Sequence, residues 1–235
     1  MLVCSTWLAF GQNQAERVQV TKSETGEFPA GGTLRLEKSV DELWIEGWDQ
    51  PGFDITTTKT TRDYVPATEL TQAKADLERV RVTCSRQGRE LIVRTESKGR
   101  KFDLEYRIHV PRTAALVVEH HTGGLQVDDV SGNVKASVSQ GLIMLRLPAD
   151  RQLAINAKST WGSVTSDFRG ISTTAESCTV APCSFATFPF GHRVRESATA
   201  PQQELYLRVG FGDILIMKEN NPGSIVVRQT SKSGL

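Results

Sequence analysis

The sequence has few cysteines, no long apolar run and no excess of charge of one sign. It contains 4 Cys in 235 residues, and 28 Lys and Arg against 27 Asp and Glu. No stretch reaches the ~20 apolar residues that a membrane-spanning helix needs. Basic and acidic residues are interleaved, whereas proteins that bind nucleic acid or anionic membranes usually have clustered basic residues. Neither a transmembrane segment nor a nucleic-acid partner is therefore predicted.

Sequence motifs of common enzymes are also missing. The chain has no P-loop, no dinucleotide-binding fingerprint and no G-x-S-x-G motif. A glycosidase needs two carboxylates facing a sugar across roughly 5–10 Å. Asp103, Glu105 and Asp213 are better explained as outward strand residues or turn residues. No catalytic residue and no cofactor is predicted, and the chain is not expected to be an enzyme.

The densest group of potential metal ligands contains two adjacent histidines. His120 and His121 lie near Glu119, Asp128 and Asp129. In an extended strand adjacent side chains point to opposite faces, so the two imidazoles cannot easily share one ion. Glu119 and His121 do share a face, and Asp128 could approach from a neighbouring strand. A solvated sheet face is favoured over a metal site.

The first residues resemble the end of a secretory signal peptide. Residues 2–10 are mostly apolar, and Ala9 and Gly11 place small residues at positions −3 and −1 of a cut before Gln12. This pattern is typical of a cleavage site, although the positively charged start of such a peptide is missing. A buried first strand is the alternative. Export to the periplasm, the cell envelope or the outside is expected.

The cysteines fit an oxidising compartment. Cys178 and Cys183 are close enough in sequence to close a small disulfide loop. A metal site would need further ligands at matching spacing, which the sequence does not supply. Cys84 lies in an alternating strand pattern and is expected to be a small buried hydrophobic residue.

The N-terminal half predicts strands and one helix. Alternating runs at 33–36, 42–48, 53–58 and 102–110 predict strands. Leu70, Ala73, Leu77 and Val80 recur at helical spacing after Pro66, which predicts a helix that packs onto a sheet. Trp44 and Trp48 share one face of a strand. They could cap the core or form a platform for stacking sugars, and core packing is favoured.

The C-terminal half repeats a pattern of strand, glycine turn and strand. The segments begin at Leu116, Val134, Leu153 and Leu205. The turn glycines are Gly124, Gly141, Gly162 and Gly212, and the first two intervals are 17 and 21 residues. This spacing is near the length of one coil of a β-solenoid, in which each coil stacks on its neighbours.

An insertion separates the last two repeats. It covers residues 168–201 and carries the cysteine pair together with Phe185, Phe188 and Phe190. Long loops on rigid scaffolds often carry function, so these aromatic residues are predicted to form an interaction loop. A plug over one end or side of the solenoid is the alternative.

The segment IHVPRTAALVVEHHTGGLQVDDVSGNVKASVSQGLIMLRL resembles the bacterial putative-adhesin domain of unknown function. SVDELWIEGWDQPGFDI and the helix before VRVTCSRQGRELIVRT are similar to the same family. The likeness extends from about residue 33 onward. Gly141 is followed by Leu142 where the family has a small polar residue, and the insertion with its cysteines is a second departure. The resemblance implies a β-solenoid and an envelope location, but no reaction and no functional residues.

The sequence thus predicts an all-β protein with three parts. Residues 1–11 are a signal-peptide remnant, 12–110 a β-rich part with one helix, and 111–235 a β-solenoid with the insertion. The expected function is that of a non-catalytic exported scaffold, adhesin-like, that binds a protein or a glycan. Self-assembly through exposed end strands is the first alternative. A carbohydrate-active enzyme on a β-helix is the second.

Overall fold

The computed structural model describes residues 15–29, 31–96, 101–168, 172–175, 192–196 and 201–219. Within them the chain is mainly β, which confirms the predicted class. The strands are β1 (Gln19–Gly26), β2 (Thr33–Ser39), β3 (Glu42–Trp48), β4 (Phe53–Thr61), β5 (Arg81–Gln87), β6 (Glu90–Glu96), β7 (Phe102–Pro111), β8 (Ala115–Asp128), β9 (Val134–Pro148), β10 (Leu153–Trp161), β11 (Val164–Ser166), β12 (Ser172–Ala175), β13 (His192–Glu196), β14 (Gln203–Phe211) and β15 (Ile214–Glu219).

The predicted helix is present as η1 (Ala67–Glu69), a 3-10 turn, followed by α1 (Leu70–Glu78). Pro66 precedes the first turn, where its fixed φ and missing N–H do no harm. Leu77 and Val80 are buried, and the helix packs against β1 and β4. Among the described residues, no helix has both the length and the apolar character required to cross a membrane.

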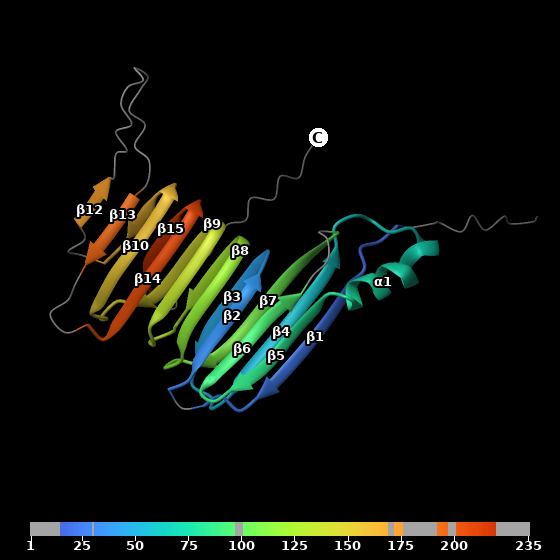
Figure 1. Cartoon of the computed structure of the whole chain (residues 1–235), viewed down its shortest axis with the longest axis horizontal. Coiled ribbons are helices and arrows are strands. Elements are labelled where there is room, and N and C mark those ends of the chain that lie inside the picture. Colours follow the sequence, from blue (N-terminus) through green and yellow to red (C-terminus); the bar gives the residue numbers. More distant parts are fainter. Residues whose placement is uncertain are drawn as a thin grey trace, which may run out of the picture.

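The strands form one hydrogen-bonded sheet of mixed parallel and antiparallel pairs, which divides into two ladders. The first ladder has the order β5-β6-β2-β8-β9-β14-β10-β13-β12, and the second has the order β1-β4-β7-β3-β8-β9-β15-β11. β8 and β9 are long and take part in both. Figure 1 shows the strands side by side along the long axis, with α1 near one end and β12 at the other.

Both ladders contribute to one hydrophobic core. In β8, Leu116 and Val118 are buried before the bend, and Leu125 and Val127 are buried after it. The buried positions change from even to odd residue numbers across the bend, so that side chains of both arms of the strand face inward. Each such buried aliphatic side chain contributes roughly 1.5–3 kcal/mol.

The central strands stack as layers, each consisting of a strand, a corner residue and a second strand. The layers follow the order β2/β3, β8, β9, β14/β15 and β10/β11. Their corner residues, in the same order, are Asp41, Gly123, Gly141, Gly212 and Gly162, and all have positive φ. A Cβ on any of these four glycines would collide with the carbonyl oxygen of the preceding corner residue. The close stacking of corners therefore requires glycine.

Two details of the predicted repeat need correction. The first corner is Gly123, one residue before the predicted Gly124, because Gly123 is the residue that pairs with Gly141. The last repeat, β14/β15, lies between β9 and β10/β11 rather than after them. β10 pairs with β13 along one edge and with β14 along the other. β14 in turn pairs with β9, so it lies between β9 and β10.

The parallel stack of short strands is thus observed, while a solenoid with coils in chain order is not confirmed. Repeats in a sequence identify strands that can stack, but every strand has two edges, and the repeats do not say which neighbour takes which edge. Strands from both sides of residue 110 pair with one another, as β3 and β8 do. The division of the chain into parts at that point stays a prediction.

Candidate binding sites

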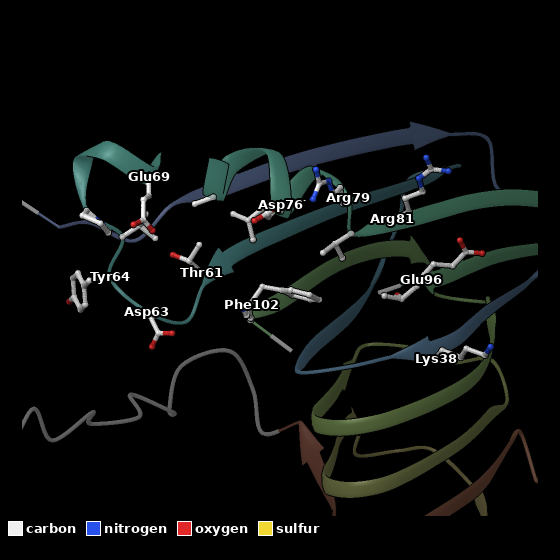
Figure 2. A pocket seen from close by; sticks show the side chains of 17 residues that line it. Lys38, Thr61, Asp63, Tyr64, Glu69, Asp76, Arg79, Arg81, Glu96 and Phe102 are labelled. Atoms are coloured by element: carbon white, nitrogen blue, oxygen red, sulfur yellow. Dashed lines mark hydrogen bonds and ion pairs between the residues drawn. The ribbon is translucent and has the colours of Figure 1, made fainter. Parts of the chain in front are cut away.

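One hollow of the described structure is a cavity of about 1130 Å³ beneath α1. Figure 2 shows it between the helix and the ends of the strands, with Phe102 and Thr61 beside it and Tyr64 at one side. Its lining comprises Lys38, Thr61, Asp63, Tyr64, Val65, Pro66, Glu69, Ala73, Asp76, Leu77, Arg79, Val80, Arg81, Thr95, Glu96, Lys101 and Phe102.

The cavity is lined by buried apolar side chains and by charged side chains around them. Leu77, Val80 and Phe102 are buried. The rim carries acidic and basic groups in equal number, and Asp76 forms an ion pair with Arg79 at 2.9 Å. The carboxylates of Glu69, Asp76 and Glu96 lie at separate places around the rim (Figure 2). This arrangement can hold an apolar group between mixed charges, but it brings no two carboxylates together for acid–base chemistry.

A second candidate lies on the outward side of the second ladder. In β3, Leu43 and Ile45 are buried, whereas Trp44 and Trp48 are half-buried on the opposite side. The expectation that the two tryptophans cap the core is therefore wrong. They sit four residues apart on an extended strand, roughly 13 Å along it.

Neighbouring side chains hold both indole rings. The Arg107 guanidinium lies 4.4 Å from the Trp44 ring centroid. The His109 ring stacks on Trp48 with centroids 5.2 Å apart, and Trp48 Nε1 donates to the carbonyl oxygen of Gly52 at 3.2 Å. Contacts of this kind restrict the orientation of an aromatic side chain. Both rings are thus positioned before any ligand arrives.

Polar groups lie between and beside the tryptophans. Glu46 projects between them, and its Oε2 lies 3.5 Å from His109 Nε2. On the next strand Asp128 pairs in register with Glu46, and its Oδ2 accepts a hydrogen bond from Gln126 at 2.6 Å. Burial raises the pKa of Asp128, and Gln126 and Arg146 partly offset this. We call Trp44, Glu46, Trp48, Arg107 and His109 the tryptophan face.

The histidine pair is split as strand geometry predicts. His120 is buried, with Nδ1 2.9 Å from Ser39 Oγ and Nε2 3.2 Å from the carbonyl oxygen of Asp41. Burial lowers the pKa of His120 to about 4. His121 and Glu119 are exposed on the other side of β8. His120 is therefore a neutral core residue hydrogen-bonded through both ring nitrogens.

The predicted disulfide and interaction loop fall outside the described residues. This applies to Cys178 and Cys183, and equally to Phe185, Phe188 and Phe190. Both ideas stay predictions. Cys84 is a free, half-buried thiol that packs against the core, and burial raises its pKa to about 11. Its expected role as a small hydrophobic residue is confirmed, although its burial is partial.

Sequence reasoning missed a group of exposed aromatic residues on the first ladder. Trp161 and Phe211 are 47% and 58% exposed and stack with ring centroids 5.9 Å apart. Tyr206 is 42% exposed and contacts Arg208. The alternation in residues 205–208 could have indicated the exposed position of Tyr206. Leu205 and Leu207 face the core, which leaves Tyr206 and Arg208 outside.

Comparisons with known proteins give two structural likenesses. One is to the crystal structure of a putative cell adhesion protein from Clostridium sporogenes, with 13% identity and a TM-score of 0.48, covering 85% of this chain and 100% of that one. Another is to a putative adhesin from Parabacteroides distasonis, with 13% identity and a TM-score of 0.27, covering 64% and 62%. No family model and no curated protein matches. At these TM-scores neither likeness bears on function.

Proposed function

We propose that this chain is an exported, non-catalytic scaffold that binds a glycan on its tryptophan face. The observation that carries the proposal is the outward position of Trp44 and Trp48 on one strand, with Glu46 between them. Indole rings offer a broad apolar surface to the C–H face of a sugar. A carboxylate and an imidazole beside them can hydrogen-bond to sugar hydroxyls.

The rigidity of the platform supports binding. The tryptophans project from β3, which pairs with β7 on one side and β8 on the other. Arg107 and His109 already stack on the rings, so little side-chain freedom is lost when a ligand binds. A site built on paired strands is also better defined than one on a loop.

The scaffold part of the proposal rests on the stacked layers and on the leader. The parallel, in-register layers give an elongated stack of the kind found in solenoids, with glycines at its corners. Residues 1–11 supply the pattern of a signal-peptide end, which favours export. An extracellular or envelope scaffold of this form would present its outer sheet faces to surrounding polysaccharides.

Calorimetric titration with soluble cello-, xylo-, manno- and chito-oligosaccharides tests the proposal. We expect at least one series to bind, and the double variant W44A/W48A to lose at least about tenfold in affinity. W161A is the matched control, because Trp161 lies on the other ladder and should leave this binding unchanged.

Equal binding by W44A/W48A and the native protein would overturn the assignment of the face, as would a lack of binding to every series. The titrated samples should also be assayed for new reducing ends. Release of shorter sugars by the native protein would contradict the non-catalytic part and favour the carbohydrate-active alternative.

A further inference from the structure

Basic side chains gather on the outward side of the first ladder, near the end formed by β12 and β13. They come from four strands, and two polar neighbours lie among them. We call this set the cationic face: Lys135, Asn156, Lys158, Arg193, Arg195, Tyr206 and Arg208. Each alternates along its strand with a buried residue, so all project from one side of the ladder.

The strand register arranges these residues in two adjacent rows. One row contains Lys135, Tyr206, Asn156 and Arg195 on successive strands. The other contains Arg208, Lys158 and Arg193. Neighbouring strands are ~4.8 Å apart, and the rows are separated by two residues, roughly 6.7 Å. The result is a lattice of basic side chains, and its second row continues through Ser137 to the exposed Glu119.

The second row places like charges directly opposite one another. Arg208 pairs in register with Lys158, and Lys158 pairs with Arg193. A polyanion lying across the row would meet all three basic side chains in succession, which favours an anionic ligand for the face.

Tyr206 provides a stacking surface within the lattice. The guanidinium of Arg208 lies 3.8 Å from its ring centroid, and the ammonium of Lys135 lies 6.0 Å away. Arg208 is held in place by hydrogen bonds to the carbonyl oxygen of Asn156 at 2.8 Å and to its Oδ1 at 3.0 Å. The aromatic ring and the cations are thus fixed side by side.

A shallow cleft of about 450 Å³ lies at this place. Its lining includes Asn156, Arg195, Tyr206 and one acidic residue, Glu204. Glu204 lies two residues before Tyr206 on β14 and pairs in register with Ala154, so it belongs to the next row and borders the lattice on that side.

We propose that the cationic face binds an acidic polysaccharide. Its carboxylate groups would pair with the basic side chains while a sugar ring stacks on Tyr206. This goes beyond the proposed function, because it concerns a different surface and a charged class of ligand. A polysaccharide with about one charge per sugar suits charges spaced by strand geometry. DNA carries one charge per ~1.7 Å and is usually met by a strongly basic protein, whereas the formal charge here is +1.

The test compares polygalacturonate with its methyl ester, which has the same backbone without the charge. We expect the native protein to bind polygalacturonate and to bind the methyl ester at least tenfold more weakly. Raising the salt from about 50 to 500 mM should also weaken binding at least tenfold, since the contacts are ionic. K135Q/R195Q and Y206A should each lose at least tenfold in affinity.

K74Q/R79Q is the matched control, because it removes the same charge from exposed residues at α1. Equal losses in K135Q/R195Q and in this control would overturn the proposal, as would tighter binding of single-stranded DNA or polyglutamate than of polygalacturonate. Failure of the native protein to bind polygalacturonate would do so as well. W44A/W48A should keep full affinity for polygalacturonate, so the two proposed surfaces can fail independently.

Discussion

His120 donates its Nε2–H to the main-chain carbonyl oxygen of Asp41, 3.2 Å away. A carbonyl oxygen can only accept, so this bond places the proton of the neutral imidazole on Nε2. Nδ1 is then the acceptor for the hydroxyl of Ser39, at 2.9 Å. The ring is buried, and burial disfavours its charged form.

The first prediction is a loss of stability in mild acid. The pKa of His120 is about 4 in the folded protein against an ordinary value of 6.5. Between these values the unfolded chain binds the extra proton. Stability is therefore complete above pH 6.5 and falls as the pH approaches 4, by about 3 kcal/mol. Urea unfolding at pH 7 and at pH 4.5 measures this.

A comparison of variants tests whether the loss of stability in acid comes from His120. Asp128 and Glu42 have raised pKa values, so they change stability with pH in the opposite direction. H120N should be less stable at pH 7 but lose less on acidification than the native protein. H121Q, which alters the exposed neighbour, should follow the native curve. Parallel curves for H120N and the native protein would exclude His120 as the cause.

The second prediction concerns the stacked corners. In G141A the new Cβ would collide with the carbonyl oxygen of Gly123, and the residue would keep a positive φ. We expect a loss of about 2–5 kcal/mol in the free energy of unfolding. G88A is the control, because Gly88 also has positive φ but open space around its Cβ position. It should lose only about 1–2 kcal/mol.

The third prediction concerns Asp41, the one corner residue that is not glycine. Its Oδ2 accepts a hydrogen bond from the main-chain N–H of Leu104 at 3.0 Å. D41A should cost about 1–3 kcal/mol, because that N–H loses its partner and alanine tolerates positive φ poorly. Asparagine keeps a side-chain oxygen that can accept the hydrogen bond, and it also tolerates positive φ. D41N should therefore lower the free energy of unfolding by less than about 1 kcal/mol. Similar losses in both would contradict this role.

The fourth prediction is the bridge between Cys178 and Cys183 in the exported protein. After cleavage of the leader, only Cys84 should react with an alkylating reagent in denaturant before reduction. All three remaining cysteines should react after reduction. Intact mass spectrometry distinguishes these states. Alkylation of Cys178 and Cys183 without prior reduction would show that no bridge forms.

The alternating patterns predicted the strands well but not always their orientation. In β14, Leu205 and Leu207 are plainly the inner residues, since Tyr206 and Arg208 between them are amphipathic. In β3, Leu43 and Ile45 lie on one face, and Trp44 and Trp48 lie on the other face together with Glu42 and Glu46. The two carboxylates mark this second face as the outward one, but the size of the indole rings favoured core packing, so the wrong face was expected inside.

The cationic face could not be predicted because it depends on pairing between distant segments. Arg208 and Lys158 are 50 positions apart, yet they are direct neighbours in register. Along the sequence the basic residues lie on four separate segments, and only Arg193 and Arg195 are close to each other. Strand order, which repeats do not specify, converts these scattered residues into a continuous surface.

The position of β14 also determines when the stack can be completed. Both strands that pair with β10, namely β13 and β14, follow it in the chain. A protein synthesised or threaded through a translocon from its N-terminus can assemble β2, β3, β8 and β9 early, but β10 must wait for residues 192–211. Until then an apolar strand has both edges unpaired. A chaperone that shields emerging chains would find its binding segment in the unpaired β10. A pause in translation after β11 would prolong the time for which β10 is unpaired.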